Sequence, residues 1–144
     1  MKKIPPIKSV MSPFPYWVEI HAPLLDAEKI MIEHDISHLP VKEKGEIVAV
    51  IASFDIDHAR SNPEFQNKLE EVLVQQVCVM EPYIVDLEEP LDNVLLHLSK
   101  HHIGSAIVMK GNRLAGVFTV NDACRCFSEF LRSQFRNMGG DDIA

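Results

Sequence analysis

The segment Gly116-Val117-Phe118-Thr119-x-x-Asp122 combines residue types that can hold a small polar ligand. An ionised Asp122 could accept hydrogen bonds from two adjacent hydroxyl groups, and such charge-assisted bonds are the stronger kind. Thr119 at the start of a helix, beside free backbone N–H groups, could hold a phosphate. Gly116 would let a neighbouring group approach the strand backbone closely, because glycine has no Cβ. Thr-x-x-Asp is also a helix-capping pattern, so a structural role is equally open, and the two roles are compatible.

Other polar side chains widen the choice of chemistry. Arg125 follows Asp122 by one helical turn and could reach a ligand phosphate or stay a solvated surface arginine. His97 and His101 have the spacing of a helical metal-ligand pair, but no convergent Cys or Asp set joins them, so no metal site is predicted. A buried or phosphate-facing histidine fits this spacing better. The sequence has no nucleophile–base–acid constellation, P-loop, GxSxG, HExxH or Rossmann fingerprint, and it therefore predicts no enzyme activity.

Composition limits the class of protein. The 144 residues are 47% hydrophobic, which predicts a folded core in one compact domain or two small units. The net charge of −7 argues against a nucleic-acid or anionic-membrane binder, which would usually have a basic face. Three cysteines without framework spacing, no apolar signal-peptide core and no apolar run of ~18 residues favour a cytoplasmic location.

The elements that must position these residues occur twice. The sequence matches itself without a gap at a shift of 67 residues, from Val10 on Val77 to Asp55 on Asp122. Further identical pairs are Pro23-Leu24 with Pro90-Leu91, His34 with His101, Ile36 with Ile103, Val41 with Val108 and Val50 with Val117. A match held in one register over this length indicates an internal repeat.

Each copy predicts the element order β-α-β-β-α. The expected elements are strands over 16–19 and 83–86, helices from 23 and 90, strands over 38–41 and 105–108, strands over 47–52 and 114–119, and helices from about 55 and 122. One copy is too small to bury its sheet, so we expect an α+β pair with sheets inside and helices outside. The predicted division is 1–60 for the first motif, 61–76 for a helical connector, 77–137 for the second motif and 138–144 for a flexible tail. The helix of the connector is expected because Asn62-Pro63 suits a helix cap followed by a first-turn proline, and apolar residues follow at helical spacing: Phe65, Leu69, Val72 and Leu73.

The motifs resemble those of a tandem CBS-domain pair, also called a Bateman module. The resemblance covers roughly residues 4–130 and lies in the order of the motifs, which is duplicated in register. The motifs of copy one are Val10-Met11-Ser12-Pro13, Pro23-Leu24 and His34-x-Ile36-x-His38-Leu39-Pro40-Val41. Those of copy two are Ile103-Gly104-Ser105-Ala106-Ile107-Val108 and Gly116-Val117-Phe118-Thr119-x-x-Asp122. The resemblance implies a pseudo-twofold disc with clefts between strands. It also implies a regulatory ligand such as AMP, ADP, ATP or S-adenosylmethionine, with no required cofactor.

The resemblance implies a principal ligand site on the second copy, with the base between strand residues and the ribose and phosphate at the Gly-Thr-Asp segment. This set is Tyr83, Ile84, Val85, Ile103, Gly104, Ser105, Ala106, Gly116, Thr119, Asp122 and Arg125. Copy one keeps the acid as Asp55 but has Ala49 and Ala52 in place of the glycine and threonine. We therefore expect a weaker second site there, formed by Tyr16, Val18, Ser37, His38, Pro40, Ser53, Asp55 and His58.

The resulting hypothesis is a stand-alone regulatory module that binds an adenosine-containing ligand and signals its occupancy to a partner protein. The alternative is a structural or dimerisation module without a physiological small-molecule ligand. An apolar stripe on the last predicted helix exceeds what so short a chain needs for itself and predicts a homodimer. The stripe consists of Phe127, Phe130, Leu131 and Phe135. The sequence leaves open the ligand, the regulated partner and the orientation of the dimer.

Overall fold

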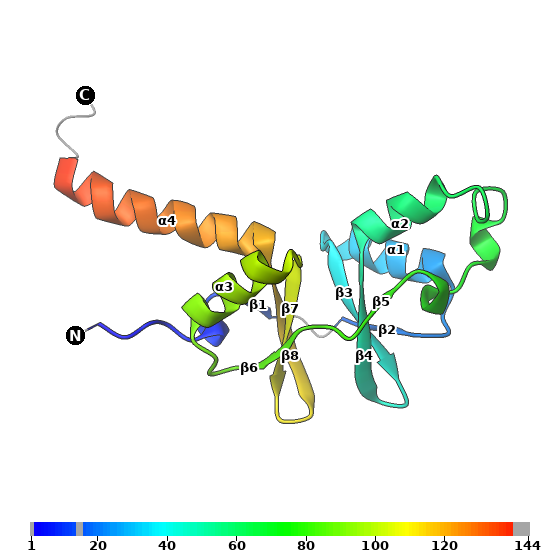
Figure 1. Ribbon diagram of the computed structural model, residues 1–144, viewed down its shortest axis with the longest axis horizontal. Helices are drawn as coiled ribbons and strands as arrows, with labels where there is room; N and C mark the ends of the chain where they lie inside the picture. The colour runs from blue at the N-terminus through cyan, green and yellow to red at the C-terminus, as the bar shows by residue number, and fades with distance from the viewer. Residues whose placement is uncertain (1, 14–15, 140–144) are drawn as a thin grey trace.

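Two small sheets lie at the centre of the molecule and the helices lie on their outer sides (Figure 1). The computed structural model describes residues 2–13 and 16–139. The first unit contains β2 (Val18–Glu19), α1 (Leu24–His34), β3 (His38–Glu43), β4 (Glu46–Ala52) and α2 (Ser53–Arg60). The second unit contains β6 (Ile84–Asp86), α3 (Leu91–His101), β7 (Ser105–Lys110), β8 (Arg113–Thr119) and α4 (Val120–Gly139). The predicted α+β fold with two β-α-β-β-α repeats is confirmed.

The fourth strand of each sheet comes from the segment that precedes the repeat of the other unit. The strand β1 (Ser12–Pro13) pairs antiparallel with β8 of the second unit. The strand β5 (Val79–Met80) pairs antiparallel with β4 of the first unit. The strand orders are therefore β1-β8-β7-β6 and β2-β3-β4-β5. This exchange ties the two units together, and no pattern within one copy predicted it.

The first helix of each unit follows the same local rules. Leu24, Ala27 and Met31 of α1 recur at helical spacing and are buried against the sheet. Helix α1 ends where Asp35 adopts a left-handed backbone with φ 52°, and α3 ends in the same way at His102, with φ 54°. These matched ends direct the chain into β3 and β7, whose first residues face the space between the units.

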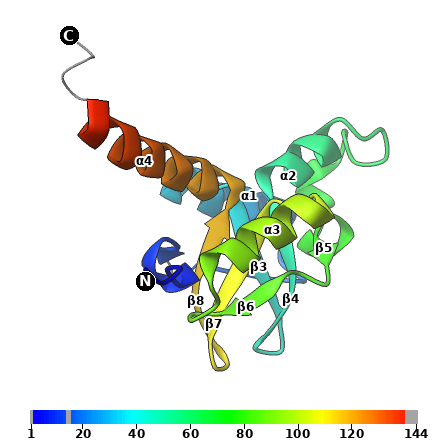
Figure 2. The same cartoon turned by 60° about the vertical axis from the view of Figure 1, so that its left-hand side comes forward.

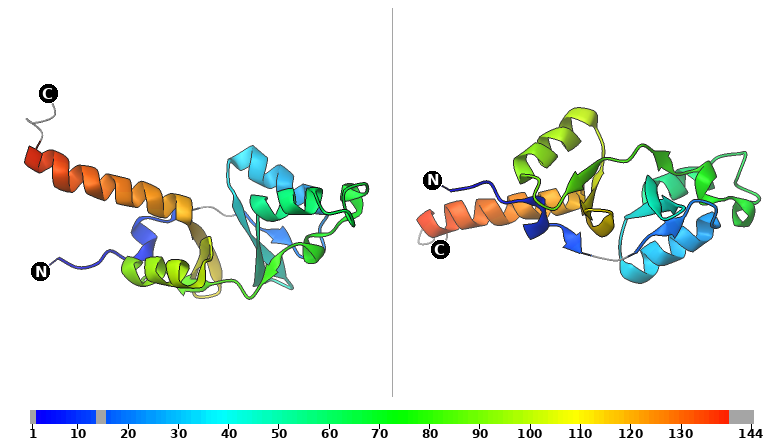
Figure 3. Two further views of the ribbon diagram at one scale, coloured as in Figure 1. Left: turned by 45° about the horizontal axis from the view of Figure 1, so that its top comes forward. Right: turned by 90° about the horizontal axis from the view of Figure 1, so that it is seen from below.

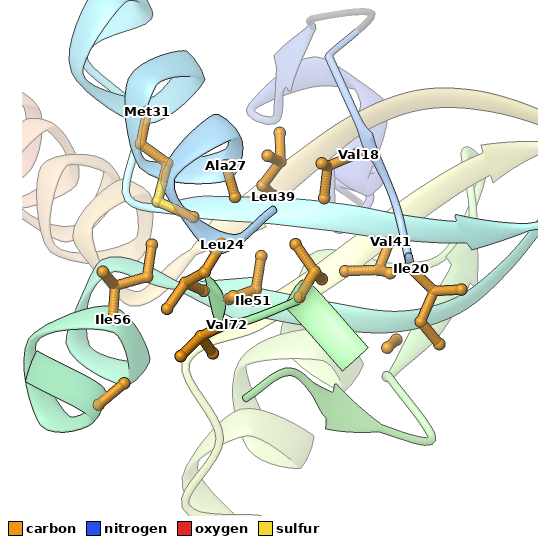
Figure 4. Close-up of a cluster of buried hydrophobic side chains, with 13 residues drawn as sticks. Val18, Ile20, Leu24, Ala27, Met31, Leu39, Val41, Ile51, Ile56 and Val72 are labelled. Atoms are coloured by element: carbon orange, nitrogen blue, oxygen red, sulfur yellow. The ribbon is translucent and has the colours of Figure 1, made fainter. Parts of the chain in front are cut away.

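Two hydrophobic cores hold the units, and each core includes residues from outside its own repeat. Figure 4 shows the first core, where side chains of α1, β3 and β4 point toward one another. Val72 and Val74, which precede the second repeat, belong to this core. Ile7, which precedes the first repeat, is fully buried in the second core. The segments before each repeat therefore stabilise the other unit.

The predicted helical connector over 61–76 is wrong as a continuous helix. This segment forms turns and two short 3-10 helices, Leu69–Glu71 and Val74–Gln76. Its backbone pairs with the first unit instead, because Val74 N donates to the carbonyl oxygen of Ala22 at 2.9 Å. The Oδ1 atom of Asn62 accepts a hydrogen bond from Glu64 N at 2.9 Å, which makes a turn at the position expected to cap a helix.

Helix α4 is the longest helix and extends away from the body of the molecule in every view (Figures 2 and 3). It continues to Gly139, so residues 138 and 139 are helical where the sequence predicted the start of a flexible tail. Residues 140–144 of that predicted tail lie outside the described residues. No helix within 2–13 or 16–139 is long and apolar enough to cross a membrane.

Gly116 lies where β1 runs beside β8. Pro13 is its partner in the register, and a Cβ built on Gly116 would lie 2.5 Å from the carbonyl oxygen of Ser12. At the equivalent place in the first unit, Ala49 faces Met80 and does carry a Cβ. The glycine therefore accommodates a neighbouring strand, and this explains why the two copies differ at this position.

We expect the substitution Gly116→Ala to lower the free energy of unfolding by about 1 to 3 kcal/mol, the usual cost of overpacking a tight site. Chemical denaturation would measure this loss. The control is Gly45→Ala, where a Cβ meets nothing within 4 Å and only the φ of +81° disfavours alanine, with an expected cost of about 1 to 2 kcal/mol from the backbone alone. A smaller loss for Gly116→Ala than for Gly45→Ala would contradict the close approach of β1.

Candidate functional site

A cleft of about 910 Å³ lies between the two units. Its volume falls within the roughly 300–1,000 Å³ of typical small-molecule sites. One wall comes from β4, α2 and β5 and the opposite wall from α3 and the starts of β6 and β7. The lining residues are His38, Val50, Ala52, Phe54, Asp55, Val79, Glu81, Pro82, Tyr83, Ile84, His97, His101, His102, Ile103, Gly104 and Ser105. We call this space the interdomain cleft.

Asp55 is the carboxylate that the first unit contributes to the interdomain cleft. It lies in the first turn of α2, where its Oδ2 atom accepts a hydrogen bond from Ala52 N at 2.8 Å. Among the described residues, no side chain donates a hydrogen bond to Asp55. The carboxylate therefore keeps lone pairs that a ligand hydroxyl could use.

Stacked rings form part of the opposite wall. Tyr83 stacks on His97 with ring centroids 3.7 Å apart, and His97 lies 4.3 Å from His101 in a tilted arrangement. Burial raises the pKa of the Tyr83 phenol, so it stays neutral. A planar base could stack on this surface, since aromatic rings favour offset face-to-face contacts.

The three histidines of this wall, His97, His101 and His102, were not among the predicted ligand-binding residues. The spacing of His97 and His101 favours a buried or phosphate-facing histidine over a metal ligand, but the sequence did not place either residue at the ligand site. Within the part of the chain that the structure describes, no group of three or more His, Cys, Asp or Glu residues is placed to hold a metal ion. The missing signal was the position of Tyr83 against the same helix, which only the fold brings together.

Asp122 is enclosed by the protein itself and is only 5% exposed. Its Oδ2 atom accepts hydrogen bonds from Thr119 N at 2.9 Å and Thr119 Oγ1 at 3.1 Å. Its Oδ1 atom accepts from Ser12 Oγ at 3.2 Å and from Arg125 Nη1 at 3.1 Å. Asp122 N donates to Thr119 Oγ1 at 3.2 Å, which completes the capping arrangement. These contacts leave the carboxylate little capacity for a ligand.

The space beside Asp122 is small. The described residues form a hollow of about 90 Å³, which is well below the usual size of a ligand pocket. Its lining residues are Ser12, Asp35, Ile36, Ser37, His38, Val117, Thr119, Asn121 and Asp122. Phe14 and Pro15, the counterparts of Glu81 and Pro82, lie outside the described residues.

The structure does not bring the predicted site residues together copy by copy. Tyr83, Ile84, Ile103, Gly104 and Ser105 of the second copy line the interdomain cleft with His38 and Asp55 of the first. Ser37 and His38 line the small hollow with Thr119 and Asp122. The strand residues of one copy therefore face the acid of the other copy. That these residues bind a ligand stays a prediction.

The other predicted residues lie outside both spaces. Val18, Pro40, Val85 and Ala106 are buried, Tyr16 stacks on His34 with centroids 3.7 Å apart, and Gly116 lies under β1. Ser53 lines a separate cavity beside α1, and His58 lines another beside Phe65. Arg125 also donates from Nη2 to the carbonyl oxygen of Val10 at 3.4 Å, so its guanidinium is held against the second unit.

His38 lies between the two spaces and lines both of them. A Cβ built on Gly104 would lie 3.0 Å from His38 Nε2, so the ring packs directly on the backbone of the other unit. Burial lowers the pKa of His38, and the negative charges of Asp55 and Asp122 oppose this effect only in part. His38 therefore stays neutral when the pH falls just below 6.5, the ordinary pKa of a histidine side chain.

This lowered pKa predicts a dependence of stability on pH. The unfolded chain binds a proton at His38 near pH 6.5 while the folded chain does not, so the stability from this residue is lost as the pH falls below about 6.5. We expect His38→Gln to reduce the loss of unfolding free energy between pH 7.5 and 5.5. Urea titrations at both pH values would measure it, with the exposed His58→Gln as the matched control. Equal losses in the wild-type chain and in His38→Gln would contradict this prediction.

Two segments of the chain, residues 7–62 and 74–129, match the family model of the CBS domain. The chain belongs to the CBS domain family. The resemblance based on the sequence motifs is thereby confirmed as a tandem CBS pair, and the matched segments correspond to the two units of the fold.

Solved CBS pairs have the same architecture. One is the CBS domain pair of protein MJ0100 in complex with 5′-methylthioadenosine and S-adenosyl-L-methionine, 29% identical with a TM-score of 0.76, covering 88% of this chain and 98% of that one. Another is the CBS domain of a bacterial CNNM/CorC family Mg²⁺ transporter in complex with ATP, 25% identical with a TM-score of 0.66, covering 82% and 83%.

The chain also matches part of a larger curated protein. It is 32% identical over 123 residues to an L-aspartate semialdehyde sulfurtransferase of Methanocaldococcus jannaschii. The match covers 84% of this chain but spans only 23% of the length of that relative. The similarity therefore concerns one part of the sulfurtransferase.

Proposed function

We propose that this CBS pair is a cytoplasmic regulatory module that binds an adenosine-containing ligand in the interdomain cleft and signals its occupancy to a partner protein. It acts by binding and not by catalysis. The observation that carries the proposal is the placement of Asp55, a carboxylate with free lone pairs, opposite the stacked rings of Tyr83, His97 and His101.

The cleft offers complementary surfaces to the two halves of a nucleoside. A ribose has two adjacent hydroxyl groups, and Asp55 can accept hydrogen bonds from both. An adenine ring can lie on the aromatic wall beside the apolar residues Ile84 and Ile103. The related CBS pair with 5′-methylthioadenosine and S-adenosyl-L-methionine supports the same ligand class here.

A thermal-shift screen and isothermal titration test this proposal. The panel is adenosine, 5′-methylthioadenosine, S-adenosylmethionine, AMP, ADP, ATP and NAD. A compound that binds only the folded state must raise the melting temperature, by a free energy of about 2.7 kcal/mol at one hundred times its Kd. We expect at least one adenosine compound to raise it, whereas guanosine serves as the control. No shift and no heat with any compound of the panel would contradict the proposed function.

The exposed face of α4 favours a second role, homodimerisation. Phe127, Phe130 and Phe135 are 61%, 55% and 67% exposed, and Leu131 lies on the same face. Apolar side chains that gather on one helix usually mark an interaction surface. A second copy of the chain offers the same apolar stripe, so the two stripes can bury each other across a twofold axis.

We expect the double substitution Phe127→Ser and Phe130→Ser to convert the protein from a dimer to a monomer of 16.3 kDa. Light scattering during size-exclusion chromatography would measure the mass. The control is Glu129→Ser on the opposite side of α4, which should leave the dimer intact. A wild-type mass of one chain at micromolar concentration would exclude the dimer.

A further inference from the structure

The interdomain cleft has an unusual charge for a site that would hold a nucleotide. Its charged lining residues are two acids, Asp55 and Glu81, and the described residues contribute no Lys or Arg to its lining. Phosphate sites in proteins usually contain arginine or lysine, because these side chains carry a permanent positive charge. The carboxylates of Asp55 and Glu81 therefore contribute a formal charge of −2 to the lining.

The nearby arginines are committed to other partners. Arg60 at the end of α2 donates from both Nη atoms to Glu28, at 2.6 and 2.7 Å. Arg125 donates to Asp122 and Val10 on the side of the small hollow. The N-terminus of α2, whose partial positive charge could attract a phosphate, is already capped by Asp55 through Ala52 N. Within the described part of the chain, the cleft lining therefore offers a phosphate neither a Lys or Arg side chain nor the uncapped N-terminus of α2.

Two residues that line the cleft have an uncommon backbone conformation. Glu81 and His102 have left-handed φ angles of 58° and 54°, so these two lining residues adopt a conformation that few side chains favour. Glu81 lies between β5 and β6, where the chain passes from one unit to the other. Glu81 is thus placed at the cleft by the connection between the two units.

We infer that the cleft selects adenosine compounds by charge: it binds uncharged or cationic adenosine compounds and discriminates against those with a 5′-phosphate. This inference rests on the proposed function, and it narrows the ligand class within it. A 5′-phosphate would add negative charge to a lining that already contains the carboxylates of Asp55 and Glu81, and like charges repel one another.

The test compares adenosine with AMP, because the two differ only in the 5′-phosphate. Isothermal titration of the full chain at pH 8.0 should give a Kd for AMP at least tenfold higher than that for adenosine. The substitution Glu81→Lys should lower the ratio of the Kd for AMP to that for adenosine at least fivefold at pH 8.0. The control Glu70→Gln removes an exposed acid outside the cleft and should leave the ratio unchanged.

The outcomes separate this inference from the proposed function. Tighter binding of AMP than of adenosine at pH 8.0, or an unchanged ratio in Glu81→Lys, would overturn the selection by charge while ligand binding stands. Absence of binding by both compounds at pH 8.0, together with no shift of the melting temperature by S-adenosylmethionine, would overturn the proposed function and this inference with it.

Discussion

Asp55→Asn should weaken the binding of adenosine by roughly thirtyfold, which corresponds to the loss of about 2 kcal/mol when hydrogen bonds to a charged acceptor are removed. The carboxylate faces the interdomain cleft and its Oδ2 atom has only the backbone partner Ala52 N at 2.8 Å. Asparagine keeps an oxygen that can accept from Ala52 N, so the cap of α2 and the stability should change little. Isothermal titration would measure the affinity.

The matched control is the same substitution at the equivalent position of the second copy. Asp122→Asn removes a carboxylate that is 5% exposed and surrounded by Ser12, Thr119 and Arg125. We expect it to change the affinity for adenosine by less than threefold, because Asp122 does not line the interdomain cleft. The motif-based prediction places the principal site at Asp122 and expects the opposite order. A larger loss of affinity in Asp122→Asn than in Asp55→Asn would contradict the assignment to the interdomain cleft.

The repeat and its elements could be predicted because they depend on local patterns. The helical spacing of Leu24, Ala27 and Met31 and the turns at Gly45 and Gly111 are visible in short windows of sequence. The duplicated register then required both units to have one fold. These signals were sufficient for the α+β pair and for its family.

The pairing of residues across the clefts could not be predicted, because it depends on contacts between distant segments. The strands β1 and β5 cross between the units, and β1 brings Ser12 to Asp122, 110 residues away. A motif-based reading assumes that Gly116, Thr119 and Asp122 face a ligand. In the fold, Gly116 makes room for β1 and Asp122 binds Ser12, so both residues serve the strand exchange.

The segment 61–76 is a second case in which contacts between distant segments could not be predicted from a local pattern. Phe65, Leu69 and Val72 have helical spacing, and the sequence predicted one helix on that basis. In the fold they contact the first core as an irregular segment. The carbonyl oxygen of Val72 accepts from Leu24 N at 2.8 Å, so the backbone hydrogen bonds that a helix would make within itself are made with α1 instead.

Asp122→Ala should lower the free energy of unfolding by about 2 to 3 kcal/mol, the largest loss of stability that we predict at a candidate site residue. The substitution removes the cap of α4, worth about 1 kcal/mol, and leaves Ser12 Oγ and Thr119 N without their acceptor. The ion pair with Arg125 adds little, because the arginine side chain is 51% exposed and becomes solvated. Chemical denaturation would measure the loss.

Asp55→Ala is the matched comparison for stability, because both acids occupy the same position of the repeat. Among the described residues, Asp55 accepts a hydrogen bond only from the backbone N–H of Ala52, so its removal should cost only about 1 kcal/mol. The two acids should thus have different roles. Asp122 should contribute more to the stability of the fold, and Asp55 should contribute more to the affinity for adenosine. Equal losses of stability would mean that β1 is not held through Asp122. The structural difference between the two copies would then lie at Gly116 alone. In that case the exchange of β1 and β5 would not explain why only the second copy keeps the glycine, the threonine and the acid of the motif.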